Sequence, residues 1–161
     1  MAVPSKTRRR RIDAQQRERR RRGDDWEQEL ANELDSYGWA KRWPRGWSGQ
    51  PWDISAMLDG HAYAIECKRI VSGNLGYSCF TANEIENLSR WEDAGGCAVI
   101  AIRRDAPFAS CFVPWYAVRE AILAGERGSI RPGEWPTDLS AAGEIPRPLD
   151  CGGCRCHDHD D

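Results

Sequence analysis

Apolar residues first become periodic after residue 23, and their spacing predicts a helix. They recur at i, i+4, i+8 and i+11 and so share one helical face: Trp26, Leu30, Leu34 and Tyr37. Asp24 or Asp25 can cap the start of this helix, and Gly38 is suited to its end. We therefore expect an amphipathic helix that packs one side against a core.

Two runs with the character of strands follow, residues 52–58 and 61–68, separated only by Asp59-Gly60. Asp-Gly favours a two-residue type I′ turn, because both central residues of that turn need positive φ. The sequence therefore predicts an antiparallel hairpin. Residues 39–43 alternate apolar and basic side chains, which predicts a short strand before it.

A second helix is predicted over residues 81–94 by its end signals. Thr81 can cap it, Glu84 completes a capping box, and Gly95-Gly96 ends it. Three more elements follow: a buried strand at 97–103, a strand at 110–115 and a short helix at 116–124. This order predicts an α/β fold with a mixed sheet flanked by helices. Beyond Gly125 the chain is rich in glycine, proline and acid, and we expect loose structure there.

Charge is distributed unevenly along a chain whose net charge is −2. Residues 1–22 hold ten basic side chains against two acidic ones, a balance of +8, so the remainder carries −10. A strongly basic arm on an acidic body is typical of a protein that binds a polyanion such as DNA. Eight arginines of this arm are candidate DNA contacts: Arg8, Arg9, Arg10, Arg11, Arg19, Arg20, Arg21 and Arg22. The alternative is a solvated tail without a specific partner, and the arm is either disordered or an extension of the following helix.

Hydropathy and cysteine content bear on the compartment. No run reaches the roughly 18 apolar residues of a membrane helix, and no apolar run follows the N-terminal arginines as in a signal peptide. We therefore expect a cytoplasmic protein of a prokaryotic or phage-infected cell, with no membrane partner. Seven cysteines, an odd number, favour reduced thiols over a disulfide framework.

The C-terminal tail combines five side chains that bind zinc readily: Cys151, Cys154, Cys156, His157 and His159. Their spacing makes Zn²⁺ binding chemically easy. A structural zinc site normally joins two distant segments, however, and this pattern lacks a second pair of ligands. A flexible polar tail is therefore the alternative to a zinc site.

The predicted hairpin brings three charged side chains together. With Asp59-Gly60 as a two-residue loop, Asp53 lies directly opposite Glu66. Directly opposed residues have Cβ atoms about 4.5–5.5 Å apart and point to the same face. Lys68 follows Glu66 by two residues and shares that face by strand alternation. The opposite face collects the residues of a core: Ile54, Ala56, Leu58, Tyr63, Ile65 and Cys67.

Two opposed carboxylates repel one another, and a divalent cation would offset that repulsion. A few hard oxygen ligands with open water positions describe a Mg²⁺ site that acts on phosphate, and Mn²⁺ could substitute. Lys68 would orient or deprotonate the attacking water and neutralise charge that builds on the phosphate. The alternative is that Asp53 caps a turn while Glu66 and Lys68 form an exposed ion pair.

The spacing of Asp53, Glu66 and Lys68 after an N-terminal helix resembles the PD-(D/E)xK nuclease superfamily. More narrowly, five segments resemble the Holliday junction resolvases of the archaeal Hjc and bacterial RecU kind: GDDWE (23–27), SGQPWDI (48–54), AIECK (64–68), ANEIENL (82–88) and FVP (112–114). The resemblance covers about residues 23–116. It implies a restriction-endonuclease-like core with a mixed sheet.

The resemblance also implies a role for each matching residue. Asp53 and Glu66 would be metal ligands, and Lys68 would be the catalytic lysine. Glu27 would be the helix-borne acid that completes or supports the metal site. Ser48 would match a serine of the Hjc loop that approaches the cleavage site.

Two positions depart from the family pattern. Trp52 stands where the motif has proline, although Pro51 is adjacent, and Glu84 stands where the RecU pattern often has glutamine. We assign no catalytic role to Glu84. The loop 44–51, with Arg45, leads straight into the candidate site and is the best place for substrate contact. Four nearby tryptophans could stack on bases or pack in the core: Trp39, Trp43, Trp47 and Trp52.

These observations predict a Mg²⁺-dependent, structure-selective DNA endonuclease, a Holliday junction resolvase of recombination and repair that works as a homodimer. One alternative is a restriction-like or repair nuclease that acts on other DNA. Another is an inactive module that keeps the nuclease fold and only binds nucleic acid. The expected organisation is a basic arm (1–22), a nuclease domain (23–125) and a loosely structured C-terminal region (126–161).

Overall fold

The computed structural model describes residues 6–44, 49–137 and 139; the side chains of residues 6–12 and 19 fall outside that description. Its elements, in chain order, are α1 (Lys6–Asp35), β1 (Trp39–Arg42), β2 (Ile54–Leu58), β3 (His61–Ile70), β4 (Leu75–Gly76), the 3₁₀ turn η1 (Tyr77–Cys79), α2 (Ala82–Asp93), β5 (Cys97–Arg104), β6 (Ala109–Pro114), α3 (Tyr116–Leu123), β7 (Ser129–Ile130) and the 3₁₀ turn η2 (Pro132–Glu134). Each strand and helix expected between residues 39 and 124 is present within one or two residues of its predicted bounds.

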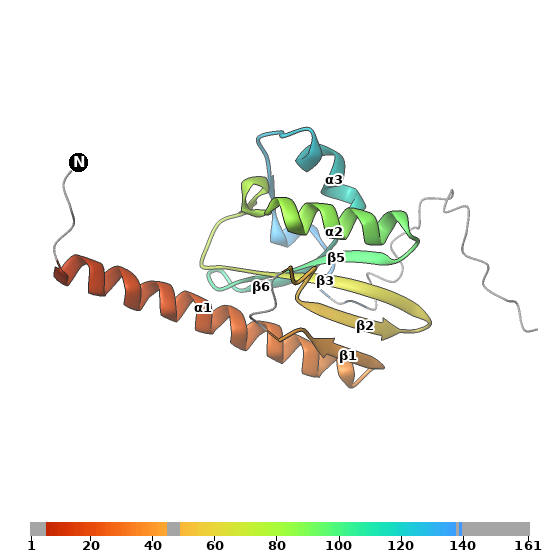
Figure 1. Cartoon of the computed structure of the whole chain (residues 1–161), viewed down its shortest axis with the longest axis horizontal. Coiled ribbons are helices and arrows are strands. Elements are labelled where there is room, and N and C mark those ends of the chain that lie inside the picture. The colour runs from red at the N-terminus through yellow and green to blue at the C-terminus, as the bar shows by residue number, and fades with distance from the viewer. Residues whose placement is uncertain (1–5, 45–48, 138, 140–161) are drawn as a thin grey trace, which may run out of the picture.

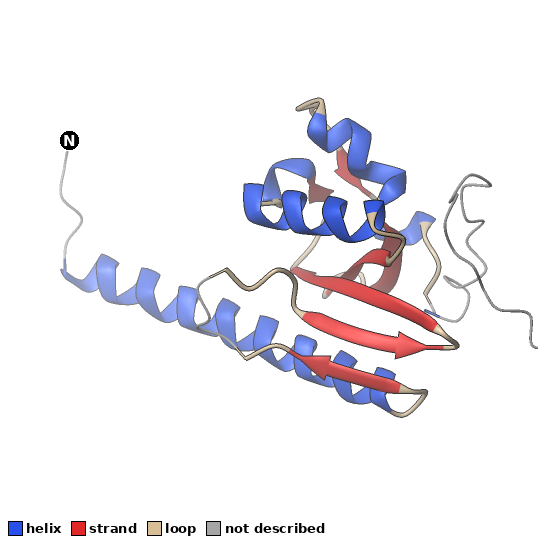
Figure 2. Cartoon of the chain, turned by 45° about the vertical axis from the view of Figure 1, so that its right-hand side comes forward, coloured by secondary structure: helices blue, strands red, loops and turns tan. Residues whose placement is uncertain are grey.

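Five strands form one mixed sheet in the order β1-β2-β3-β5-β6. β3 and β5 pair in parallel, with α2 as the crossover between them, and the other neighbours pair antiparallel. Helix α1 lies along one face of the sheet, while α2 and α3 lie on the other (Figures 1 and 2). The expected α/β architecture is therefore confirmed.

The β2–β3 hairpin has the turn that its sequence predicts. Asp59 and Gly60 both have positive φ, 48° and 75°. Ile54 pairs with Ile65 in the resulting register, and the amide of Asp53 donates to the carbonyl of Ile65 at 3.1 Å. Asp53 therefore lies at the end of the hairpin opposite the turn, one residue beyond the paired part of β2.

The strand alternation divides the apolar side chains between two cores. The core under α1 is built from residues that include Leu30, Leu34, Ile54, Ala56, Tyr63 and Ile65. The core under α2 and α3 includes Leu88, Ile100, Ile102, Val113, Trp115 and Ile122. Fully burying one such large side chain stabilises a fold by roughly 1.5–3 kcal/mol, so each face of the sheet is strongly specified. This fixes Glu66 and Lys68, which alternate with Ile65, on the face toward α2.

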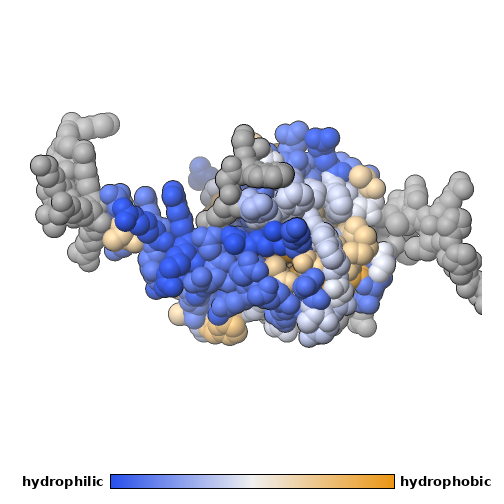
Figure 3. Space-filling view, turned by 60° about the horizontal axis from the view of Figure 1, so that its bottom comes forward, coloured by the Kyte–Doolittle hydropathy of each residue, from blue (hydrophilic) through white to orange (hydrophobic). Residues whose placement is uncertain are grey.

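Helix α1 differs from the expectation at both ends. It runs without a break from Lys6, so Asp24 and Asp25 lie inside it and do not cap it. For residues 6–22 of the basic arm, the structure shows the helical extension, the second of the two alternatives. The N-terminal half extends beyond the sheet (Figure 1), and the outer surface of the helix is strongly hydrophilic (Figure 3).

At its C-terminal end, α1 stops at Asp35, and Tyr37 is 74% exposed and not on the apolar face. Gly38 instead permits close packing, because a Cβ there would lie 2.6 Å from the carbonyl oxygen of Met57.

The chain directly after Gly125 is ordered, contrary to the loose structure expected there. Ile130 of β7 pairs with Leu75 of β4 and is buried, and the amide of Phe112 donates to the carbonyl of Pro136 at 2.9 Å. The reason is that a few apolar residues anchor this glycine- and proline-rich segment to the second core. The candidate zinc ligands of the tail lie outside the described residues: Cys151, Cys154, Cys156, His157 and His159.

Two further expectations concern the whole chain. In the part that the structure describes, no helix is both long enough and apolar enough to cross a membrane. The four cysteines in that part carry free thiols: Cys67, Cys79, Cys97 and Cys111.

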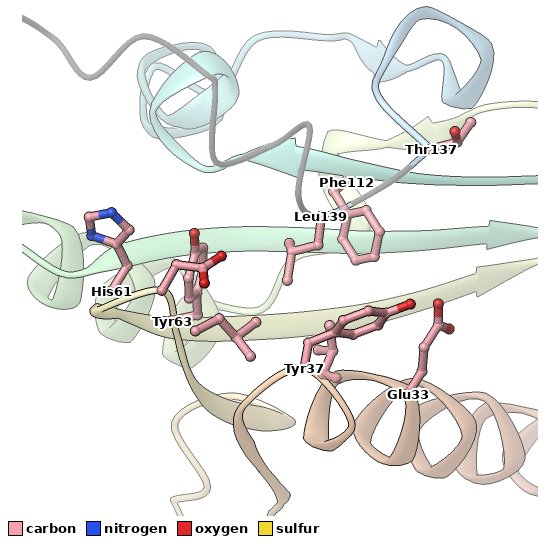
Figure 4. A pocket seen from close by; sticks show the side chains of 10 residues that line it. Glu33, Tyr37, His61, Tyr63, Phe112, Thr137 and Leu139 are labelled. Carbon is pink, nitrogen blue, oxygen red and sulfur yellow. The ribbon is translucent and has the colours of Figure 1, made fainter.

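A cavity of about 510 Å³ opens at the turn end of the hairpin (Figure 4). Its lining includes Tyr37, His61, Tyr63 and Phe112. His61 thus lies on the apolar side of the hairpin, as its position in the strand predicts. The cavity is at the opposite end of β2 from Asp53, and it is distinct from the cluster of carboxylates described next.

Candidate active site

The predicted site residues come from three elements near the end of the β2–β3 hairpin opposite its turn. Asp53 directly precedes β2, Glu66 and Lys68 project from β3 on the face toward α2, and Glu27 belongs to α1 on the other face, where its charge still acts on Asp53. Glu66 and Glu27 are among the few buried polar residues, with relative exposures of 4% and 6%. Burial of acidic side chains is costly unless partners or a cation offset their charge, so these buried acids are chemically distinctive.

The Asp53 carboxylate is held by two donors. Its Oδ2 accepts a hydrogen bond from the amide of Cys67 at 2.8 Å, and its Oδ1 accepts one from the side-chain amide of Gln50 at 3.2 Å. Gln50 also donates to the carbonyl of Trp52, which ties the loop before β2 to the site. These contacts set the carboxylate against the middle of β3, beside Glu66.

Asp53 and Glu66 interact unfavourably with one another. Burial raises the pKa of Asp53 to about 6, and the negative charge of Glu27 contributes to the rise. Burial likewise raises the pKa of Glu66 well above its usual range, and the charge of Asp53 adds to that effect. The two carboxylates are therefore electrostatic neighbours, as the hairpin register predicts, and their charges are not fully compensated.

The amine of Lys68 donates to two carboxylates. Its Nζ lies 2.8 Å from Oε1 of Glu66 and 2.9 Å from Oε1 of Glu84, and 5.4 Å from the centre of the Phe80 ring. Burial disfavours the charged amine, but the two carboxylates outweigh burial and raise the pKa of Lys68 above its ordinary value. The alternative of an exposed ion pair is wrong, because the side chains of Lys68 and Glu66 are only 16% and 6% exposed. The side chain of Lys68 is thus largely buried, and its two carboxylate partners favour the protonated amine.

Glu27 is engaged by a basic residue of the first strand. Its Oε2 accepts from Nε of Arg42 at 2.8 Å, and Arg42 also pairs with Asp24 at 2.6 Å. This arrangement joins α1 to β1 next to the site. It gives Glu27 a fixed orientation, which distinguishes it from Glu33, the exposed acid beside the same apolar stripe.

The donor set suits a hard divalent cation. In residues 6–44, 49–137 and 139, no three histidine, cysteine, aspartate or glutamate side chains converge as a ready-made metal cluster. Mg²⁺ does not need one, because it retains several waters and is commonly bound by one or two carboxylates plus substrate phosphate. Asp53 and Glu66 supply two carboxylates. Their raised pKa values indicate that nearby positive charge does not fully offset burial and mutual repulsion, and a bound cation would do so. The residues present therefore fit such an ion.

The contacts that two residues make with the site were not predicted from the sequence. Glu84, which was predicted only to cap α2, also contacts Lys68 across 16 positions of sequence. Gln50 contacts Asp53 and accepts at its carbonyl from the side chain of Asn83 at 2.9 Å. The capping box signalled the position of Glu84 at a helix start, but no local pattern could reveal which strand faces that start.

The tryptophans near the site divide into packing residues and one exposed residue. Trp43 and Trp52 both donate from Nε1 to Oγ of Ser55, at 2.9 and 2.8 Å, and the ring of Trp52 lies 4.9 Å from that of Trp91. Trp39 is 54% exposed. Three further candidates for substrate contact lie outside the described residues: Arg45, Trp47 and Ser48.

The basic arm is described in part. Arg20 is exposed, and Arg21 and Arg22 pair with Glu18 on the preceding turn. Arg22 also lies 3.8 Å from Asp105 of the body. For the remaining arginines the helical backbone alone is described: Arg8, Arg9, Arg10, Arg11 and Arg19.

The raised pKa of Asp53 predicts a pH-dependent stability. A carboxyl whose pKa is higher in the folded than in the unfolded protein favours folding below the unfolded value, and this advantage is lost as pH rises through the folded value. The window for Asp53 therefore lies between about 3.8 and about 6. Asp53→Asn should raise the unfolding free energy of the metal-free protein at pH 7 by about 1–3 kcal/mol, since one pKa unit corresponds to about 1.4 kcal/mol.

Thermal unfolding of both proteins between pH 5 and pH 7 measures this effect. The wild-type protein should lose more stability than Asp53→Asn as the pH rises. Equal losses would show that the Asp53 carboxylate carries no unfavourable charge in the fold.

Comparison with known proteins places this chain in a family. The family model described as archaeal Holliday junction resolvase (Hjc) matches residues 18–127, more than half of the chain. A solved structure of Hjc from Archaeoglobus fulgidus, described as a Holliday junction resolvase from an archaeal hyperthermophile, is 30% identical, with 57% of this chain and 76% of that chain covered and a TM-score of 0.46. No curated protein sequence matches the chain. The matched segment contains the described site residues from Glu27 to Glu84.

Proposed function

Because the chain belongs to the archaeal Holliday junction resolvase (Hjc) family, we propose that it is a Mg²⁺-dependent endonuclease that cuts branched DNA at four-way junctions. The metal-dependent part of this proposal is supported by the two largely buried carboxylates, Asp53 and Glu66, which repel one another beside Lys68. Residues 23–125 would form the nuclease domain, and the arm would add contacts to phosphate.

Asp53 and Glu66 would hold the metal ion. When bound, Mg²⁺ supplies Lewis acidity that polarises a phosphate and lowers the pKa of water. The Cys67 amide and Gln50 orient the Asp53 carboxylate toward β3. Glu27, fixed by Arg42, would support the site from α1.

Lys68 would act as a positive charge beside the reacting phosphate. Two carboxylates favour its protonated form, so at neutral pH it is better suited to neutralise charge or orient water than to remove a proton. A fixed cation in a partly dehydrated site acts more strongly than the same charge in water. This role requires an open approach for the phosphate, and we propose that residues of the loop 44–51 before Asp53 contact the substrate there.

Symmetric incision of a four-way junction needs two sites related by a two-fold axis. We therefore propose that the protein works as a homodimer. Each copy would bring one Asp53–Glu66 site and one basic arm.

Purified protein should be assayed with Mg²⁺ on a four-way junction, a linear duplex, a flap and single-stranded DNA. We expect the junction to be cut at least about tenfold faster than the duplex, a preference worth about 1.4 kcal/mol in the transition state. Equal cutting of linear duplex would favour the restriction-like or repair nuclease. Tight junction binding without any Mg²⁺-dependent cleavage would favour the inactive binding module.

A further inference from the structure

The side chain of Glu84 links the start of α2 to the candidate metal site. Its Oε1 lies 2.9 Å from Nζ of Lys68, and its Oε2 accepts from the amide of Thr81 at 2.9 Å. We propose that Glu84 is a positioning residue which, by holding Lys68, sets the affinity of the Asp53–Glu66 pair for a divalent cation. The inference rests on the metal site proposed above.

Lys68 and a metal ion compete for the same carboxylate. Nζ of Lys68 lies 2.8 Å from Oε1 of Glu66, the side chain that is also a proposed metal ligand. A cation that binds this carboxylate repels the ammonium and weakens its contact there. A largely buried ammonium that loses one acceptor is unfavourable unless Lys68 keeps a second acceptor. Glu84 is that acceptor.

Glu84 is well placed for this task because the helix start fixes it independently of Lys68. The hydroxyl of Thr81 accepts from the Glu84 amide at 3.3 Å, which completes the capping box. One carboxylate oxygen thus serves the backbone and the other serves Lys68. Glu84 therefore stays in place whether or not Lys68 also contacts Glu66.

The first turn of α2 also helps to hold Asp53, the other proposed metal ligand. The Asn83 side chain donates to the carbonyl of Gln50 at 2.9 Å, and Gln50 donates to Asp53. Glu86, on the same helix, is exposed and makes no such contact. A substitution at Glu84 therefore differs from one at Glu86 in its contact with Lys68, although both remove one negative charge.

Binding of Mn²⁺ to the DNA-free protein, followed through the electron paramagnetic resonance signal of free Mn²⁺, tests the inference without cleavage. Glu84→Gln should weaken the Kd for Mn²⁺ about tenfold, which corresponds to about 1.4 kcal/mol. Glu86→Gln should change it less than about twofold, since it leaves Lys68 untouched. An unchanged Kd for Glu84→Gln would overturn the inference.

Two further variants separate the contact with Lys68 from other effects. Thr81→Ala removes the hydroxyl cap but keeps the backbone amide that donates to Oε2 of Glu84. It should therefore lower stability by about 1 kcal/mol while leaving the Kd for Mn²⁺ within about twofold. Loss of affinity in Thr81→Ala equal to that in Glu84→Gln would mean that fraying of α2 is the cause. In a Lys68→Ala background, Glu84→Gln should have less than about a twofold effect, because the competing ammonium is gone.

A full tenfold effect in the Lys68→Ala background would show that Glu84 acts on the cation directly, and the inference would be wrong. Failure of the proposed function looks different. It would appear as a wild-type protein that cuts none of the four DNA substrates in Mg²⁺. A wild-type protein that cuts the junction, with a Glu84→Gln variant that binds Mn²⁺ normally, would overturn this inference alone.

Discussion

Asp53→Asn is expected to lower the rate of junction cleavage by about 10³-fold while changing junction affinity less than about threefold. The substitution keeps the shape of a side chain that accepts from the Cys67 amide but removes the charge that a cation requires. Loss of one group that stabilises charge in a transition state typically costs 10²–10³ in rate, and loss of a side chain proposed to bind the metal ion should reach the upper end. Lys68→Ala should reduce cleavage to a similar extent through loss of the adjacent positive charge.

Asp59→Asn provides a matched control, because it makes the same chemical change at the turn end of the same hairpin. Asp59 is exposed and has a φ of 48°, a conformation that asparagine also tolerates. Its cleavage rate should stay within about twofold of wild type. Single-turnover cleavage and equilibrium binding on one junction measure both quantities. If Asp53→Asn still cut at more than a tenth of the wild-type rate, the assignment of Asp53 as a metal ligand would be wrong.

Neutralising the N-terminal arginine cluster should have the second-largest effect, this time on binding. We expect glutamine at all four of Arg8, Arg9, Arg10 and Arg11 to weaken junction binding about 10- to 100-fold at 0.1 M salt. Each lost phosphate contact should flatten the slope of log K against log salt by about 0.9, so the total change should be about 2–4. Glutamine is a good helix former, so α1 should persist. The cleavage rate at saturating DNA should not change.

Substitution is a cleaner test than deletion of residues 1–22. The carbonyl of Arg22 accepts from Arg69 at 2.8 Å, so a deletion that reaches Arg22 would also disturb the body. Lysine at the same four arginine positions is the matched control. It preserves charge, and affinity and salt slope should remain close to wild type. A glutamine variant with the wild-type salt slope would exclude the arm from DNA binding.

Features governed by neighbouring residues could be predicted from the sequence. The Asp59-Gly60 turn fixes the hairpin register, and the register brings Asp53 and Glu66 together. The capping box between Thr81 and Glu84 places the start of α2. Family membership followed from the same short segments. In each case the physical cause lies within a few residues, where sequence order and spatial order coincide.

Features that depend on contacts between distant elements could not be predicted. The Glu84–Lys68 contact needs the packing of α2 on β3, and the Glu27–Arg42 pair needs α1 beside β1. The pairing of β4 with β7 joins two segments of two residues each, too short to give a periodic signal. The length of α1 was left open because an arginine-rich segment has no apolar face to mark its helical period.

Because α1 is one unbroken helix, the tip of the basic arm lies at a fixed distance from the proposed site. Lys6 and Glu27 lie 21 residues apart on one helix, a span of about 32 Å at 1.5 Å per residue. One turn of B-DNA measures about 34–36 Å, so an arm that follows the DNA axis would span about one turn from the proposed site. Since the base of the helix packs in the same core as β2 and β3, the fold itself sets the distance between the tip of the arm and that site.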